Sequence, residues 1–226
     1  MVLSFGEVLS LTISITTAKR YLKQAGLVYK RMRLSLKDKR DPVLFELFYQ
    51  ELEMLKVLED QQEIDLYFFD EMGLTLTPKV PYAWQPKNQT VGLPTAHSPV
   101  LTTLGFVNRK FDLQSFVFQG AANTQIVIKC MEDFVAQITK KTVVILDNAP
   151  IHKSILMSSK IKEWKQKGLL LQFIPAYCPE LNYIERLWKH IKYQCLPVEA
   201  FKNLDSLNLH LEKVLKNIKK YHFNFA

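Results

Sequence analysis

Two carboxylates stand at the points where apolar segments of the chain end. Asp70 follows residues 64–69 (Ile-Asp-Leu-Tyr-Phe-Phe), and Asp147 follows residues 143–146 (Val-Val-Ile-Leu). Four consecutive apolar residues, three of them β-branched, are typical of a strand buried on both faces of a sheet. A carboxylate at the end of such a strand can hold a metal ion, and it can also serve only to cap a turn. For either residue taken alone, both interpretations stay open.

A third carboxylate follows Pro179, close to the start of a predicted helix, and Glu180 and Glu185 are both candidates for it. An acid directly after the proline is ordinary in the first turn of a helix, where it interacts favourably with the helix dipole. Glu185 lies one turn further along, beside the apolar Ile184 and Trp188. We therefore favour Glu185.

Three carboxylates that converge on one crevice would suit two hard divalent cations. Mg²⁺ prefers oxygen ligands, keeps several waters and is commonly shared between carboxylates and a substrate phosphate. Two such ions activate the attacking oxygen and stabilise the leaving oxygen of an in-line displacement at phosphorus. The chemistry predicted for Asp70, Asp147 and Glu185 is phosphodiester hydrolysis or strand transfer with Mg²⁺ or Mn²⁺.

The elements that must position these acids alternate along the chain, which predicts an α/β fold. Because neighbouring strand residues point to opposite faces, Asp70 and Glu71 cannot both face one crevice if the strand continues through them, so we expect Glu71 to be structural. We expect residues 74–77 to pair back as a hairpin. The other predicted strands are residues 100–107, 111–119 and 169–174, and the predicted helices are residues 14–26, 41–60, 123–140, 154–166, 181–195 and 204–219.

The composition is that of a globular protein, with 226 residues, 48% hydrophobic and 23% charged. Three cysteines, none in a Cys-x-x-Cys pair, argue against a disulfide framework or a zinc ribbon and for a reducing compartment. No apolar run approaches the length of a membrane span. We expect a cytoplasmic protein without a membrane partner. The net charge of +8 favours a polyanion as partner.

The basic residues concentrate near the N-terminus. Between Ser14 and Arg40 there are nine of them and a single acid, Asp38. A basic helix preceded by the end of another helix, at residues 5–11, is the pattern of a helix-turn-helix, whose second helix enters the major groove. A solvated surface is the alternative interpretation. The predicted DNA-binding residues are Lys19, Arg20, Lys23, Lys30, Arg31, Arg33 and, in a proline-broken loop, Lys87.

Four stretches carry a resemblance to a known family. They are residues 69–73 (Phe-Asp-Glu-Met-Gly), 82–87 (Tyr-Ala-Trp-Gln-Pro-Lys), 146–154 (Leu-Asp-Asn-Ala-Pro-Ile-His-Lys-Ser) and 175–188 (Pro-Ala-Tyr-Cys-Pro-Glu-Leu-Asn-Tyr-Ile-Glu-Arg-Leu-Trp). They resemble the motifs of mariner-like DDE transposases, in particular the bacterial insertion-sequence relatives. The chain departs from the family pattern at Cys178, where serine is usual, and at Tyr183, where proline is usual. Both positions shape the turn into the last helix of the motif, so we expect these departures to be tolerated.

The resemblance implies a ribonuclease H-like core, a mixed sheet flanked by helices and preceded by a partial helix-turn-helix. It assigns catalysis and metal binding to the same three acids, Asp70, Asp147 and Glu185. It further implies DNA transposition of an insertion sequence in the bacterial cytoplasm at the nucleoid. The implied partners are double-stranded DNA, as transposon ends and target, and a second copy of the chain in a homodimer. The implied cofactor is a pair of Mg²⁺ or Mn²⁺ ions.

Thirty-seven residues separate Asp147 from Glu185, which is within the spacing that the resemblance implies for these two acids. Two auxiliary residues belong to the same motif. Asn148 is expected to stabilise the turn after Asp147. His152 has two structural interpretations, a cap of the helix that follows or a hydrogen bond to the turn, and two functional ones, contact with the scissile phosphate or orientation of a metal ligand.

We predict three segments: residues 1–30 form a partial helix-turn-helix, residues 31–62 a basic linker and helix, and residues 63–226 the ribonuclease H-like catalytic domain. Relatives usually carry a fuller DNA-binding region, and this chain is expected to begin inside it. The prediction is a metal-dependent transposase that cleaves and joins DNA. The alternatives are a truncated, catalytically silent remnant that binds DNA or inhibits the full-length transposase, and a stand-alone nuclease, which the basic N-terminal region disfavours.

Overall fold

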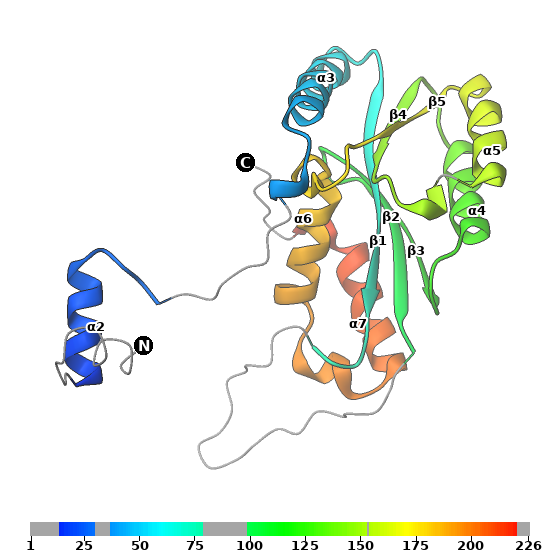
Figure 1. Ribbon diagram of the computed structural model, residues 1–226. Coiled ribbons are helices and arrows are strands. Elements are labelled where there is room, and N and C mark those ends of the chain that lie inside the picture. Colours follow the sequence, from blue (N-terminus) through cyan, green and yellow to red (C-terminus); the bar gives the residue numbers. More distant parts are fainter. Residues whose placement is uncertain (1–13, 30–36, 79–98, 153, 221–226) are drawn as a thin grey trace. The chain divides into compact units, whose positions relative to one another are not determined.

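The computed structural model describes residues 14–29, 37–78, 99–152 and 154–220 (Figure 1). Contacts divide the chain into two units, residues 1–36 and 37–226. The three segments predicted from the sequence stay a prediction. In the described ranges, no helix is both long and apolar enough to cross a membrane.

The first unit contains the helix α2 (Ile15–Gln24). It begins as predicted at Ser14, whose hydroxyl accepts a hydrogen bond from the N–H of Thr17 at 3.1 Å, and it ends before Gly26, which has a φ of +74°. None of the residues of α2 is buried. The predicted preceding helix at residues 5–11 lies outside the described residues.

A five-stranded mixed sheet forms the centre of the second unit, with the strand order β3-β2-β1-β4-β5. Strand β1 pairs antiparallel with β2 and parallel with β4, so the two strands that lead to the predicted acids lie side by side. Strand β2 pairs antiparallel with β3, and β4 pairs parallel with β5. The strands are β1 (Asp65–Leu74), β2 (Leu101–Asn108), β3 (Leu113–Gln119), β4 (Thr142–Leu146) and β5 (Leu169–Phe173).

Helices cover both faces of this sheet. Helices α4 and α5 pack on one face, and α6 and α7 on the other, together with part of α3 (Figure 1). The helices are α3 (Pro42–Asp60), α4 (Thr124–Val135), α5 (Ile155–Gln166), α6 (Tyr183–His190) and α7 (Leu204–Lys216). Short 3₁₀ turns lie at Lys37–Lys39, Pro150–His152, Pro179–Leu181, Val198–Lys202 and Ile218–Lys220, and a π-helical turn lies at Ile191–Cys195.

Strand alternation decides which face each side chain joins. Phe69 and Leu146 pack with α4 and α5, whereas Phe68 and Ile145 pack with α6 and α7. Full burial of such side chains stabilises the fold by about 1.5–3 kcal/mol each. Since side chains two positions apart share a face, Asp70 follows Phe68 toward the α6 side of the sheet.

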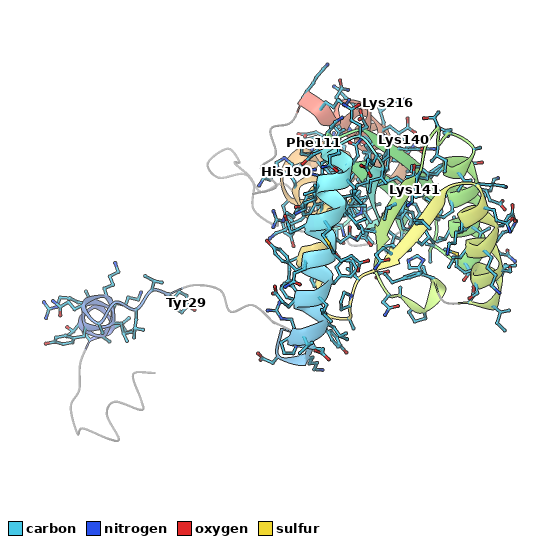
Figure 2. All side chains as sticks on the ribbon, turned by 90° about the horizontal axis from the view of Figure 1, so that it is seen from above. Tyr29, Phe111, Lys140, Lys141, His190 and Lys216 are labelled. Carbon is cyan, nitrogen blue, oxygen red and sulfur yellow. The ribbon has the colours of Figure 1, made fainter. Side chains whose placement is uncertain are left out.

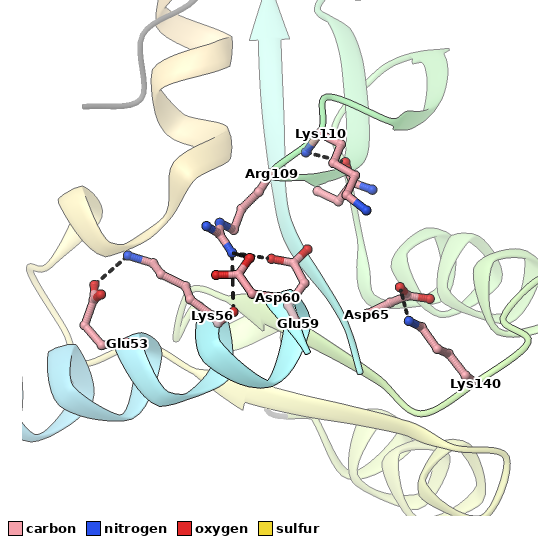
Figure 3. Close-up of polar contacts among 9 residues, drawn as sticks. Glu53, Lys56, Glu59, Asp60, Asp65, Arg109, Lys110 and Lys140 are labelled. Atoms are coloured by element: carbon pink, nitrogen blue, oxygen red, sulfur yellow. Dashed lines mark hydrogen bonds and ion pairs between the residues drawn. The ribbon is translucent and has the colours of Figure 1, made fainter. Parts of the chain in front are cut away.

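Helix α3 is attached to the sheet by an ion-pair network at its C-terminal end. The Arg109 guanidinium, in the loop after β2, donates hydrogen bonds to Glu59 Oε2 at 2.9 Å and to Asp60 Oδ1 at 2.8 Å (Figure 3). Burial raises the pKa of Glu59, and its hydrogen bond with Arg109 opposes that shift. Two turns earlier in the helix, Glu51 accepts a hydrogen bond from the side chain of Gln172 of β5 at 2.8 Å.

Three sequence predictions differ from the structure. The hairpin predicted for residues 74–77 is wrong, because β1 continues to Leu74 and pairs there with Leu101 of β2. Helix α4 ends at Val135 instead of near Lys140, since Lys141 (Figure 2) already accepts a hydrogen bond from the N–H of Asp65 at the start of the sheet. The helix predicted for residues 181–195 is divided into a 3₁₀ turn, α6 and a π-helical turn.

Candidate active site

The register of β1 and β4 brings the first two predicted acids together. Phe68 is opposite Ile145 at the end of the parallel pair, and Asp70 and Asp147 each follow two positions later. Parallel strands present their carboxyl ends at the same edge of the sheet, where the ligands of open α/β sheets bind. The structure therefore brings these two carboxylates to one end of the sheet.

An open cleft of about 720 Å³ lies at this end, and Asp70, Asp147 and Glu185 all line it. Glu71 also borders the cleft. The strand continues through both acids, and Glu71 is opposite Leu104, which packs with α4 and α5, so Glu71 and Asp70 point to opposite faces of the sheet as the alternation predicts. The other residues of the lining are Ala149, Ile151, His152, Pro179, Glu180, Arg186, Trp188, Lys189, Lys192 and Tyr193.

Asp70 carries the strongest electrostatic perturbation of the three acids. Burial of its carboxyl group raises the pKa of Asp70 well above its usual range, and the negative charges of Glu185 and Asp147 raise it further. A hydrogen bond from the backbone N–H of Glu71 opposes this rise. Like charges held close together in a partly desolvated place favour either a proton or a cation between them.

Asp147 is held by two hydrogen bonds. His152 Nε2 lies 3.2 Å from Asp147 Oδ1, and the backbone N–H of Ala149 donates to the same oxygen at 3.2 Å. The contact with His152 lowers the pKa of Asp147. His152 is only 6% exposed and its ring lies edge-on to Phe69, so it belongs to the buried wall behind the acid. Asn148, in contrast, is exposed.

The two candidates for the third acid have different surroundings. The Glu180 carboxylate accepts a hydrogen bond from the Arg40 guanidinium at 2.7 Å, which gives it a structural ion pair. Glu185 is in the first turn of α6. Partial desolvation raises the pKa of Glu185, the positive charge of Lys192 lowers it, and the negative charge of Asp147 raises it. Glu185 therefore interacts electrostatically with both other acids.

Basic side chains of the last helical segment of the site line the same cleft. They are Arg186 and Lys189 of α6 and Lys192 of the π-helical turn. Spacings of three residues bring side chains to one side of a helix. The sequence analysis did not single out these residues, although their spacing after Glu185 was a usable signal.

Asn182 is another residue that the sequence analysis missed. It is 1% exposed, precedes α6 directly, and its side-chain N–H donates to the carbonyl oxygen of Phe69 at 3.0 Å. Its neighbour Tyr183 stacks on Phe68, with ring centroids 4.6 Å apart. These contacts attach the start of α6 to β1 directly before Asp70. Tyr183, where the family pattern usually has proline, thus gives α6 a contact with β1.

The donor set fits a divalent cation of the magnesium type. Carboxylate oxygens are its preferred protein ligands, and one or two of them are enough, because water and substrate phosphate complete the coordination. Within residues 14–29, 37–78, 99–152 and 154–220, no group of three or more acidic, histidine or cysteine side chains is arranged so that it could hold a metal ion. Burial raises the pKa of Asp70 most, and the repulsion from Glu185 and Asp147 that adds to this rise is what a bound cation would relieve.

The predicted DNA-binding residues fall into two groups. Lys19, Arg20 and Lys23 lie on α2, and all three are exposed. Lys30, Arg31, Arg33 and Lys87 lie outside the described residues.

Comparison with known proteins places this site in a family. Residues 65–208 match the family described as DDE superfamily endonuclease, and this segment contains Asp70, Asp147 and Glu185. The chain belongs to the DDE superfamily endonucleases. The family predicted from the sequence motifs is confirmed.

One relative of this DDE superfamily chain is the "Insertion element IS630 uncharacterized 39 kDa protein" of Shigella sonnei, which is 26% identical over 193 residues. The match covers 84% of this chain and 54% of that protein, so the chain spans about half the length of the relative.

Solved structures of the Mos1 transposase share the fold. The Mos1 strand transfer complex matches with a TM-score of 0.62 and 13% identity, over 94% of this chain and 64% of that one. The catalytic domain of Mos1 mariner transposase matches with a TM-score of 0.52 and 11% identity, over 84% and 86%. A Mos1 paired end complex with Mn matches with a TM-score of 0.60 and 14% identity, over 94% and 66%. The predicted ribonuclease H-like fold, a mixed sheet flanked by helices, is confirmed.

Proposed function

We propose that this chain is the catalytic part of a DNA transposase, which cleaves phosphodiester bonds at the ends of an insertion sequence and joins them to target DNA. The observation that carries the proposal is the convergence of Asp70, Asp147 and Glu185, from β1, the end of β4 and α6, on one cleft. The similarity to an insertion element protein supports transposition as the setting of this chemistry.

Asp70, Asp147 and Glu185 would hold one or two Mg²⁺ or Mn²⁺ ions. Bound divalent ions supply the charge that activates the attacking oxygen and stabilises the leaving oxygen. The chain's own contribution is to orient the ligands. His152 and the N–H of Ala149 fix one oxygen of Asp147, and Asn182 attaches the helix of Glu185 to β1.

The substrate of this site is double-stranded DNA, as transposon end and as target. Arg186, Lys189 and Lys192 border the acids and would neutralise backbone phosphates on either side of the scissile one. The exposed basic side chains of α2 would bind DNA independently, and we extend the same role to the other basic residues predicted from the sequence, which are Lys30, Arg31, Arg33 and Lys87.

A second copy of the chain is proposed as the protein partner, in the bacterial cytoplasm at the nucleoid. Helix α3 exposes a row of apolar side chains that follow one another after four, seven and three residues. They are Val43, Leu47, Met54 and Val57. Such a stripe fits the face of another helix. Light scattering of the purified chain tests this partner, and the mass of a single chain at all concentrations would contradict it.

The test of the catalytic proposal is nicking of a DNA duplex that carries the terminal repeat of the element, with Mg²⁺ or Mn²⁺ and with chelator. We expect metal-dependent nicks from the wild type and none from Asp147→Asn or Glu185→Gln, because each removes a negative ligand. Glu180→Gln is the matched control, since it makes the same chemical change at a residue that pairs with Arg40. We expect it to cleave like the wild type.

DNA binding is measured beside cleavage, by gel shift with the terminal repeat and with random DNA. Variants that bind but do not cleave support the roles of the acids. A wild type that binds DNA and never cleaves it would refute the catalytic proposal and favour a silent DNA-binding role. Undiminished cleavage by Asp147→Asn would refute the assignment of the acids.

A further inference from the structure

Gly105 of β2 lies at an unusual place relative to the acids. In the antiparallel pair of β1 and β2, Gly105 is directly opposite Asp70. Residues directly opposite each other in adjacent strands point to the same face of the sheet. The missing side chain of Gly105 thus opens space on the α6 side, next to the most perturbed acid of the site.

Trp188 of α6 fills that space. A Cβ added at Gly105 would lie 2.7 Å from Cη2 and 2.7 Å from Cζ2 of the Trp188 indole, and 3.4 Å from Cδ1 of Ile184. Carbon atoms in favourable contact are about 3.5–4.0 Å apart. Trp188 is 2% exposed and Ile184 is fully buried, so neither side chain can swing away into water.

The glycine contact and the Asn182 contact lie on the two sides of Glu185. Asn182, three residues before Glu185, is bonded to the carbonyl of Phe69 at 3.0 Å. Trp188, three residues after Glu185, packs on Gly105. Helix α6 is thus fixed at two points, one turn apart on either side of the acid, and both points belong to the strand positions around Asp70.

We propose that Gly105 is a positioning residue of the active site: its lack of a side chain lets Trp188 seat α6 against the sheet at the depth that brings Glu185 to Asp70. This inference rests on the proposed function for the activity it affects. Gly105 itself touches neither metal nor DNA and acts through Trp188. Any side chain at this position pushes the indole, and with it the helix that carries Glu185, away from β2.

The test is the variant Gly105→Ala together with Trp188→Phe and the double variant. Phenylalanine lacks the outer ring atoms of the indole that an added Cβ at Gly105 would meet. An error of about 1 Å in the position of a catalytic group can lower the rate about 100-fold, and we expect this loss in kcat for Gly105→Ala, with DNA affinity kept. In the double variant we expect recovery to the level of Trp188→Phe alone, which is the non-additivity of two residues in contact.

Gly73→Ala is the matched control. It adds the same methyl group to β1, where the Cβ would meet Val100 Cγ1 at 3.2 Å and no other atom of the described residues within 4 Å. We expect its cleavage to stay within about threefold of the wild type, since it touches no part of α6. Thermal unfolding of every variant is recorded, so that cleavage is compared below the melting temperature of each.

Binding of Mn²⁺ without DNA, followed by calorimetry, is the second readout and does not require cleavage. We expect about tenfold or greater weakening in Gly105→Ala and recovery in the double variant, because ligand geometry controls metal affinity. If the wild type cleaves and binds Mn²⁺ and Gly105→Ala does both equally well, the positioning role is refuted while the proposed function stands.

If the wild type does not cleave, the proposed function fails and the Mn²⁺ titrations alone decide: loss in Gly105→Ala with recovery in the double variant supports the positioning role, and equal affinities refute it. If Gly105→Ala does not fold, the double variant is compared with Trp188→Phe. Equal folding and Mn²⁺ affinity of these two support the role of the contact, and a double variant that stays impaired refutes it.

Discussion

Replacement of His152 by alanine is the sharpest test of how Asp147 is held. The change removes the contact between Nε2 and Asp147 Oδ1 at 3.2 Å and leaves the N–H of Ala149 as the remaining donor. A hydrogen bond to a charged group contributes about 1.5–3 kcal/mol. Because 47% of the Asp147 side chain is exposed, solvent screens the interaction, and we take the lower end, about 1.5 kcal/mol.

If the free energy of metal binding falls by the about 1.5 kcal/mol that this hydrogen bond contributes to the orientation of Asp147, the ion binds roughly tenfold more weakly, since every 1.4 kcal/mol is a factor of ten. This agrees with the effect of removing residues that orient metal ligands elsewhere, about 10–100-fold. The assay is calorimetric titration of Mn²⁺ into the wild type, His152→Ala and His152→Gln, with the melting temperature of each. Glutamine keeps an N–H donor and is expected to bind the ion more tightly than alanine. A folded His152→Ala with unchanged Mn²⁺ affinity would refute the reasoning.

Two further predictions concern the surroundings of the site. Arg109→Ala removes the cation that pairs with Glu59, which is 10% exposed, so we expect a loss of about 1–3 kcal/mol in the free energy of unfolding by urea. Lys110→Ala, at the adjacent exposed residue, should leave that free energy within about 0.5 kcal/mol, and equal effects of the two would contradict the role of the network. Lys192→Ala should weaken DNA binding and reduce the slope of log affinity against log salt by about one; Lys167→Ala, on the other face of the sheet, should leave the slope unchanged.

The strands of the site were predictable because their apolar runs are continuous. The run at residues 143–146 became β4 with one added residue, Thr142, and every residue of β4 is buried. The strand that leads to Asp70 was predicted too short. Its polar residues were taken for its end, whereas Met72 and Leu74 continue the buried alternation of Leu66 and Phe68. The period of two was present in the sequence and outweighs the acids between.

The placement of the third acid could be predicted only in part. The choice of Glu185 over Glu180 came from its apolar neighbours, and the structure adds the reason that Glu180 is engaged with Arg40, a residue far away in sequence. No local sequence pattern predicts a contact between two positions that are so far apart in the chain. The same limit applies to His152, whose burial depends on the packing of Phe69 behind it. Contacts of this kind arise from the packing of elements that are distant in the sequence.

The candidate active site combines two acids positioned by strands with one acid positioned by a helix. Asp70 stands on β1 and Asp147 directly follows the adjacent strand β4, so the pairing of these two strands, which extends to Phe68 and Ile145, brings the two acids together. Glu185 stands on a helix, and a helix can slide on the sheet unless side chains hold it. The contacts of α6 with the sheet are concentrated beside Glu185: a hydrogen bond from Asn182 on one side and the indole of Trp188 over Gly105 on the other. How closely α6 packs on the sheet therefore determines the position of Glu185 in the candidate active site. Substitutions between the helix and the sheet should change catalysis while leaving the acids themselves intact.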